Sequence, residues 1–143
     1  MNIDKKQFLV FKLDNQEYGI DINKITTIIE KDMMIARVPD TPEFVKGVIN
    51  LRGEIIPIIE LRKRFNLPSI DDTENTRIII VKFDDVIIGF IVDEVAEVIM
   101  LDDENIENLT NFSNDLSIDY IAGAGKVDNR IVTILKLEKL ITM

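Results

Sequence analysis

The sequence contains no histidine, no cysteine and no tryptophan among its 143 residues. Without histidine it has no Ser-His-Asp or Cys-His catalytic set, no imidazole acid–base group and no histidine-ligated zinc. Without cysteine, disulfides and thiolate metal sites are excluded, and this absence fits a reducing cytosol. The missing residues therefore remove the commonest catalytic arrangements and direct attention to binding.

Long apolar runs are missing as well. No stretch approaches the roughly 18 apolar residues that a membrane-spanning helix needs. The N-terminal segment MNIDKKQFLVF contains lysines but no long apolar core and no small-residue cleavage site, so we expect no signal peptide. These absences predict a cytoplasmic protein with no direct membrane insertion.

The charge balance is acidic, with 26 acidic against 17 basic residues and a net charge of −9. An acidic chain repels phosphate backbones and anionic lipid surfaces, so we expect no nucleic-acid partner. Several of the basic residues cluster in the middle of the chain: Lys46, Arg52, Arg62, Lys63 and Arg64. This clustering favours a polarised surface that docks a charged protein, although solvated faces share the pattern.

The remaining chemistry offers little for catalysis or cofactors. The DDEN run at 102–105 lacks the alternating ligands and central glycine of a calcium loop. The GAGK run at 123–126 lacks the first glycine and the final Ser/Thr of a phosphate-binding loop. Carboxylate pairs leave an enzyme as a second hypothesis, but we expect no metal, no cofactor and no enzymatic activity.

Short runs rich in Ile, Val and Phe, separated by turn residues, dominate the chain and predict β-hairpins. The predicted strands pair in sequence as Phe8–Leu13 with Glu17–Asp21, Gly47–Leu51 with Glu54–Ile59, Arg77–Phe83 with Val86–Val92, and Gly125–Val127 with Arg130–Leu135. Their turns are Asp14-Asn15-Gln16, Arg52-Gly53, Asp84-Asp85 and Asp128-Asn129. Asp, Asn and Gly tolerate the positive φ angles of tight hairpin turns.

Helix signals are few. Thr41-Pro42-Glu43 predicts the start of a short helix, while Leu61–Phe65 and Leu137–Ile141 could each form one or two turns. Pro57 inside a strand predicts that this strand is at an edge or bulged. The pattern is typical of a mainly β protein, a small barrel or a sandwich with a few short helices.

The chain also contains an internal repeat. Phe11–Ile29 aligns without a gap on Val81–Ile99 at an offset of 70 residues, and Phe44–Phe65 aligns on Tyr120–Ile141 at an offset of 76. Glycines and turns match as well as apolar positions. We therefore expect one domain, 1–143, built of two similar interlocked subdomains from repeat halves at about 8–65 and 78–141. A groove where they meet would favour binding.

Four segments resemble the CheW family of bacterial chemotaxis coupling proteins, covering about Phe8 to Ile141. They are GIDINKI (19–25), TPEFVKGVINLRGEIIPIIELRKRF (41–65), VIIGFIVDEVAEVI (86–99) and YIAGAGKVDNRIVTILKLEKLI (120–141). The NLRG run (50–53) with its flanks is the most specific. The resemblance implies two intertwined five-stranded SH3-like β-barrels with a few short helices.

The resemblance also implies a function and partners. CheW-like proteins are adaptors that couple methyl-accepting chemoreceptors to the histidine kinase CheA. The receptor's cytoplasmic tip docks between the barrels, and the kinase's regulatory domain packs against one barrel. The coupling protein and this regulatory domain can also alternate in rings within receptor arrays. We expect a monomer in isolation that is recruited to membrane-associated receptor arrays.

Carried over position by position, the resemblance implies a set of partner-binding residues: Ile25, Thr27, Gly47, Arg52, Ile78, Val98, Phe112 and Gly123. Arg52 matches the arginine tied to coupling. The alternative for Arg52 is a solvated turn residue, Gly47 also suits a turn or packing role, and Ile78 and Val98 also suit an ordinary core. The family often has Glu at the position of Thr27, so a salt bridge at this position is in question. At the position of Arg77 the family commonly has an apolar residue.

Two rival interpretations remain beside the enzyme. A generic SH3-like peptide binder needs an aromatic-lined groove, yet the chain has no Trp and only two Tyr. Within the family, the chain could be a detached regulatory domain of the kinase or part of a receiver fusion. At 143 residues beginning with Met, it has no room for an ATPase or receiver domain, so the standalone coupler is preferred.

Overall fold

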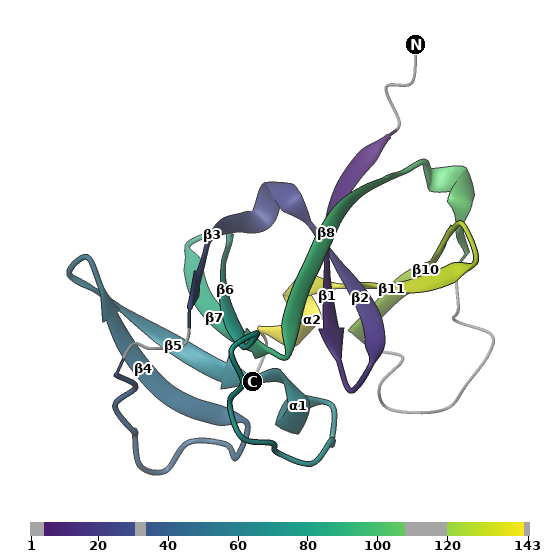
Figure 1. Ribbon diagram of the computed structural model, residues 1–143. Coiled ribbons are helices and arrows are strands. Elements are labelled where there is room, and N and C mark those ends of the chain that lie inside the picture. Colours follow the sequence, from purple (N-terminus) through teal and green to yellow (C-terminus); the bar gives the residue numbers. More distant parts are fainter. Residues whose placement is uncertain (1–4, 31–33, 108–119, 142–143) are drawn as a thin grey trace. The chain divides into compact units, whose positions relative to one another are not determined.

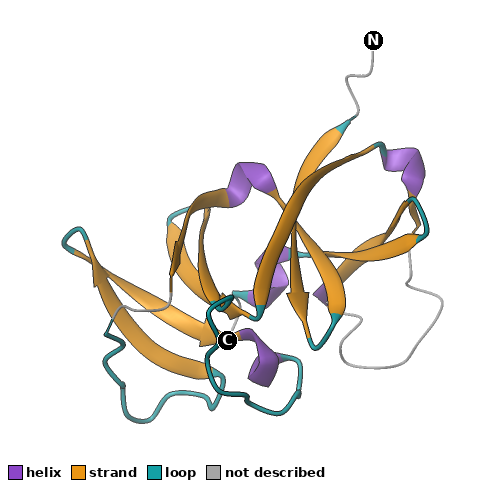
Figure 2. Ribbon diagram, in the orientation of Figure 1, coloured by secondary structure: helices purple, strands orange, loops and turns teal. Residues whose placement is uncertain are grey.

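The computed structural model describes residues 5–30, 34–107 and 120–141. Strands dominate these residues, and the two α-helices have four residues each (Figure 2). The strands are β1 (Lys6–Leu13), β2 (Gln16–Asp21), β3 (Ile25–Glu30), β4 (Val45–Leu51), β5 (Glu54–Glu60), β6 (Arg77–Phe83), β7 (Val86–Val92), β8 (Glu94–Leu101), β9 (Ile106–Glu107), β10 (Ile121–Val127) and β11 (Arg130–Leu135). The helices are α1 (Leu61–Arg64) and α2 (Leu137–Leu140), with 3₁₀ turns at Ile22–Lys24 and Asp103–Asn105.

The chain forms two compact units that are not its sequential halves. Among the described residues, unit 1 contains 5–23, 95–107 and 120–141, and unit 2 contains 24–30 and 34–94. Unit 1 has a six-stranded sheet in the order β8-β1-β2-β11-β10-β9, and unit 2 has a five-stranded sheet in the order β3-β6-β7-β5-β4 (Figure 1). The predicted mainly β, SH3-like architecture is confirmed.

Each sheet combines strands that do not follow one another in the sequence. Hairpin β1–β2 lies between β8 and β11, and hairpin β6–β7 lies between β3 and β5. The second strand of each hairpin pairs in parallel with a strand from another part of the chain, β2 with β11 and β7 with β5. Neither sheet is therefore complete without residues that are far apart in the sequence.

The hairpin turns form where the sequence predicts them. In the β1–β2 turn Asp14 and Asn15 have φ angles of 53° and 65°, and in the β4–β5 turn Arg52 and Gly53 have φ angles of 54° and 88°. The other two turns contain Asp84 and Asp128 at φ 54° and 55°. Positive φ in a two-residue turn matches the right-handed twist of the strands it joins.

The predicted helix at Thr41-Pro42-Glu43 is wrong. Thr41 and Pro42 have no regular secondary structure, and a single turn closes where the Val45 N–H donates to the Pro42 carbonyl at 2.9 Å. The Thr41 hydroxyl donates back to the Val38 carbonyl at 3.0 Å instead of capping a helix. Strand pairing prevails because β4 begins immediately at Val45 and leaves no room for a second helical turn.

The prediction for Pro57 is wrong too, because β5 is an internal strand and the register shift of the β4–β5 ladder lies between Val45 and Gly47. Pro57 pairs with Val48, whose N–H and carbonyl both bond to Ala36 and so point away from β5. The pair is thus a non-hydrogen-bonded one, in which an amide hydrogen is not needed. Pairing of β5 with β7 begins only after Pro57, at Ile58.

The same backbone hydrogen bond occurs once within each unit, at positions that differ by the 76-residue offset found in the sequence. The Glu60 N–H donates to the Phe44 carbonyl at 2.8 Å, and 76 residues later the Lys136 N–H donates to the Tyr120 carbonyl at 2.7 Å. A register shift occurs at the same place in the β4–β5 and β10–β11 ladders. The division into two repeat halves stays a prediction, and these matches support it.

Each unit has its own apolar core. The unit 1 core consists of Phe8, Val10, Ile99, Leu101, Val132 and Ile134. The unit 2 core consists of Ile49, Ile56, Ile58, Ile78, Ile80 and Ile91. The β-branched side chains that give the sequence its strand propensity are thus the ones that fill the sheets' inner faces.

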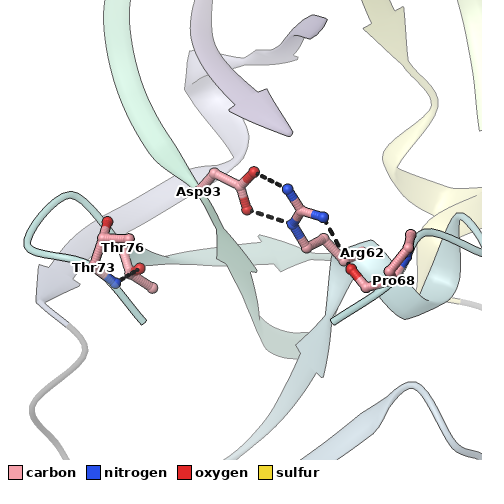
Figure 3. Close-up of polar contacts among 5 residues, drawn as sticks. All are labelled: Arg62, Pro68, Thr73, Thr76 and Asp93. Carbon is pink, nitrogen blue, oxygen red and sulfur yellow. Dashed lines mark hydrogen bonds and ion pairs between the residues drawn. The ribbon is translucent and has the colours of Figure 1, made fainter. Parts of the chain in front are cut away.

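A buried ion pair fixes the helix of unit 2. The Arg62 guanidinium on α1 is 7 % exposed and donates through Nε and Nη2 to the two carboxylate oxygens of Asp93 at 2.9 and 2.7 Å (Figure 3). Its Nη1 donates to the Pro68 carbonyl at 2.9 Å. Arg62 therefore joins α1, the end of β7 and the 65–76 connection, and does not belong to a surface basic cluster.

Side-chain hydrogen bonds also stabilise the 65–76 connection before β6 begins. The Thr73 N–H donates to the hydroxyl of the buried Thr76 at 2.9 Å (Figure 3). Ser69 donates from its hydroxyl to the Glu60 carboxylate at 2.6 Å. Side-chain hydrogen bonds thus hold a segment that forms no strand or helix.

Replacing Arg62 by Ala is expected to lower the free energy of unfolding by about 3 kcal/mol, because Asp93 and the Pro68 carbonyl lose their partner in a buried site. Arg62→Lys should lose roughly half as much, since an ammonium cannot form the forked pair. Urea unfolding followed by circular dichroism measures both. The control Lys63→Ala, on the same helix, should change stability by less than about 0.5 kcal/mol. Equal effects of Arg62→Ala and Lys63→Ala would contradict this role.

Candidate protein-binding surfaces

Arg52 lies at the exposed tip of the β4–β5 hairpin, which projects at the far left of Figure 1. The turn is held by a hydrogen bond from the Gly53 N–H to the Asn50 side-chain oxygen at 3.0 Å. Within the described part of the chain, no hydrogen bond or ion pair involves the Arg52 guanidinium. A rigid turn thus presents a cation that is available for a carboxylate or carbonyl of a partner.

An apolar surface adjoins this tip. Ile55 is 64 % exposed and lies across from Asn50, on the face of the hairpin that also carries the half-buried Val48 and Pro57. The sequence analysis missed Ile55. The available signal was the pair Ile55-Ile56, because adjacent strand residues face opposite sides and only one of them can enter the core.

Ile25 and Thr27 lie on β3, an edge strand of the unit 2 sheet. One extra residue, Thr26, interrupts the register, so that Ile25 lies opposite Val81 and Thr27 opposite Ile80. Directly paired residues share a face and successive residues of β6 alternate, so Ile25 and Thr27 are on opposite faces of the sheet. They cannot both contact one partner through the same face.

Ile78 does not provide a contact surface. It is 0 % exposed, belongs to the unit 2 core and pairs with Ile29 of β3. Any influence of Ile78 on a partner would therefore be indirect, through the position of the edge strand. The resemblance indicated a binding residue here, whereas periodicity alone indicated core.

Val98 lies on β8, an edge strand of the unit 1 sheet, and is 46 % exposed. Met100, two residues further and 58 % exposed, shares its outward face, while Ile99 and Leu101 point into the core. An exposed apolar face on an edge strand is suited to covering by another protein. Met100 was not predicted, although its alternation with buried neighbours was readable in the sequence.

Gly47 and Gly123 act through backbone packing. A Cβ on Gly47, which has φ 154°, would lie 2.2 Å from the Ala36 carbonyl oxygen and 2.8 Å from Ile35. A Cβ on Gly123 would lie 2.5 Å from the Glu107 carbonyl oxygen. Both glycines allow another segment to cross the strand closely, which for Gly47 is the packing role given above as the alternative to binding.

The predicted residues divide between the units. Those in unit 2 are Ile25, Thr27, Gly47, Arg52 and Ile78, and those in unit 1 are Val98 and Gly123. Phe112 lies outside the described residues.

Three charged residues of unit 1 form a cluster around Arg130. The Arg130 guanidinium donates to the carboxylates of Glu17 at 2.9 Å and Glu97 at 3.0 Å. The hydrogen bond to Glu97 is the main cause that raises the pKa of Arg130. Burial raises the pKa of the Tyr18 hydroxyl, with a further contribution from the charge of Asp14. Arg130 thus stabilises the unit, unlike Arg52.

The described residues offer no inorganic or membrane-spanning site. In residues 5–30, 34–107 and 120–141, no three acidic side chains are placed to share a metal ion. None of the helices in this part of the chain has the length and apolar content to cross a membrane.

An exposed arginine at a hairpin tip beside an exposed isoleucine, and an edge strand with an exposed apolar face, are typical of a protein-binding module. The model of the CheW-like domain family matches residues 7–143. The chemotaxis protein CheW of Klebsiella aerogenes is 39 % identical over 137 residues, 96 % of this chain and 82 % of that protein. CheW of Bacillus subtilis is 38 % identical over 133 residues, 91 % of this chain and 83 % of that protein.

A solved structure of a CheW protein is also similar to this chain. The crystal structure of the scaffolding protein TtCheW from Thermoanaerobacter tengcongensis superposes with a TM-score of 0.87 at 38 % identity, covering 96 % of this chain and 93 % of that one. This chain therefore belongs to the CheW-like family, a class of non-catalytic scaffold proteins of chemotaxis.

Replacing Gly47 by Ala is expected to lower the free energy of unfolding by about 3 kcal/mol, because the new methyl group collides with the Ala36 carbonyl. The matched control is Gly53→Ala, where φ is 88° but no atom lies within 4 Å of the new Cβ. It should cost about 1 kcal/mol from the backbone conformation alone. Urea unfolding compares the two variants, and an equal loss would show that packing at Gly47 is not tight.

Proposed function

We propose that this protein couples methyl-accepting chemoreceptors to the histidine kinase CheA by binding both. The observation that carries the proposal is the exposed Arg52 in the NLRG turn, set in a chain that matches the CheW-like family over nearly its whole length. The close relatives are named chemotaxis protein CheW, and the solved one is described as a scaffolding protein. No part of this role needs bond-making chemistry.

The β4–β5 hairpin supplies one contact surface. Its turn holds Arg52 in a fixed backbone geometry, and a guanidinium forms forked hydrogen bonds that a lysine cannot. Ile55 beside it adds apolar area that becomes buried on contact. A charged anchor beside an exposed apolar side chain is the composition expected of an energetic centre in an interface.

The outward face of β8 supplies a second contact surface, with Val98 and Met100. Gly47, Gly123 and Ile78 contribute by positioning backbone segments, because they have no exposed side chain to offer. Two surfaces on one chain allow two partners to be held at once, which raises the effective concentration of kinase at the receptor.

Coupling further requires that the two contacts depend on the kinase's state. A scaffold changes an equilibrium only if it binds one conformation more tightly than the other. Interfaces of less than about 1,200 Å² suffice when many copies act together. On this proposal the protein is a monomer in isolation, acts in the cytoplasm and is recruited to receptor arrays at the membrane.

The test is receptor-dependent kinase activity with the Arg52→Glu variant. We expect activation to fall about tenfold, because one charge-assisted contact is lost and a repulsive charge replaces it. Binding is measured separately by co-sedimentation with receptor fragments and kinase, and less of the variant than of the unmodified protein should appear in the pellet. The control is Lys82→Glu, which reverses the charge of another exposed cation of unit 2 and should leave kinase activation unchanged.

Circular dichroism must show that both variants are folded. Unchanged activation by Arg52→Glu would reject the role assigned to this residue. Failure of the unmodified protein to co-sediment with receptor and kinase would reject the coupling function itself.

A further inference from the structure

Met100 places a thioether on the outward face of β8, which is one contact surface of the proposed function. The outward row of this edge strand consists of Ala96, Val98 and Met100, and all three are exposed. Met100 is 58 % exposed, while its neighbours Ile99 and Leu101 point into the unit 1 core. The sulfur-bearing side chain is therefore accessible to small solutes before a partner covers the surface.

Methionine is the only sulfur-containing residue type in the chain, since the sequence has no cysteine. With no thiol to react first, a peroxide that oxidises sulfur in this protein converts methionine to its sulfoxide. Of the five methionines the structure describes two, Met34 and Met100. Met34 belongs to unit 2 and is 90 % exposed, but it is not part of either contact surface proposed above. Met100 is the described methionine whose oxidation alters a proposed contact.

We propose that Met100 is a reversible oxidation site, and that conversion of its thioether to the sulfoxide weakens the contact made by β8. Hydrogen peroxide transfers one oxygen atom: its O–O bond breaks, an S–O bond forms, the sulfur loses two electrons and the peroxide is reduced to water. A thiol-dependent sulfoxide reductase reverses the change, because it releases the oxygen as water and oxidises two thiols to a disulfide. The inference rests on the proposed function, in which the outward face of β8 contacts a partner.

The sulfoxide changes the polarity of the outward row and leaves the fold intact. Its oxygen is a hydrogen-bond acceptor, and covering it with an apolar partner surface removes its water without supplying a donor. The alkyl side chains of Ala96 and Val98 hold no sulfur, so they keep their apolar area when Met100 is oxidised. Because Met100 projects outward, the unit 1 core does not depend on its side chain. The modification therefore acts on binding.

The experiment oxidises the purified full-length protein with hydrogen peroxide and removes the peroxide before receptor fragments and kinase are added. Peptide mass spectrometry should show a gain of one oxygen at Met34 and at Met100, since both are exposed. The oxidised protein should bind roughly tenfold more weakly than the untreated protein in co-sedimentation. Treatment with the two epimer-specific sulfoxide reductases and dithiothreitol should restore binding.

Matched variants assign the effect to one methionine. Met34→Leu should lose binding on oxidation as the unmodified protein does. Met100→Leu, compared with its own untreated sample, should change by less than about twofold on oxidation, because leucine is similar in volume to methionine and has no sulfur. Met100→Gln, whose amide places a polar oxygen on the outward row, should weaken binding without any oxidant.

Three outcomes overturn the proposal: Met100 stays unoxidised while Met34 reacts, sulfoxide at Met100 leaves binding unchanged, or oxidised Met100→Leu loses binding as the unmodified protein does. Circular dichroism of the oxidised samples supplies a fourth, because a lost fold would mean that the effect is not on the contact. A failure of the coupling function is recognised separately, since the untreated protein would then not co-sediment with receptor and kinase.

Discussion

The insertion of one hairpin between strands from elsewhere in the chain is the constraint on which the rest of the structure depends. In unit 2, β7 pairs in parallel with β5 through Ile58 and Gly89. In unit 1, β2 pairs in parallel with β11 through Thr133 and Tyr18. Since β2 and β11 are near opposite ends of the chain, the unit 1 sheet forms only when nearly the whole chain is in place, which favours slow, cooperative folding.

Two glycines allow backbone segments to pass close to a strand, and these contacts set the path of the segments on the surface of each unit. Gly47 admits Ala36 against β4, and this contact sets the path of the 34–44 segment along the edge of the sheet. Gly123 admits Glu107 against β10 in the same way. A glycine that carries no contact itself can thus control binding, because it sets the path of the segment that does.

The arginines show how the same residue type serves different ends. Arg62 is buried in a forked pair with Asp93, and Arg130 is engaged by two carboxylates. Arg52 and Arg37 are exposed, without such partners in the described residues. A charged side chain that the fold already uses contributes stability, whereas one that the fold leaves unused is available to a partner.

The sequence by itself determined the local features and the family. Turn residues such as Asp14-Asn15 and Arg52-Gly53 prefer positive φ in any context, so the hairpins were predictable from neighbours alone. Alternation marked the strands, and the NLRG motif with the spacing around it carried the resemblance that the comparisons confirm. The repeat was also visible, because two copies of one strand layout need matching apolar positions.

Strand pairing and burial set the position of several residues that local patterns did not assign. The extra residue at Thr26 separates Ile25 from Thr27, Ile55 is exposed beside buried Ile56, and the expected helix at Thr41 gives way to β4. The first outcome depends on pairing with β6, which is far away in the sequence, and the other two depend on the β4–β5 ladder. Local propensities are worth fractions of a kcal/mol per residue, so distant pairing and burial override them.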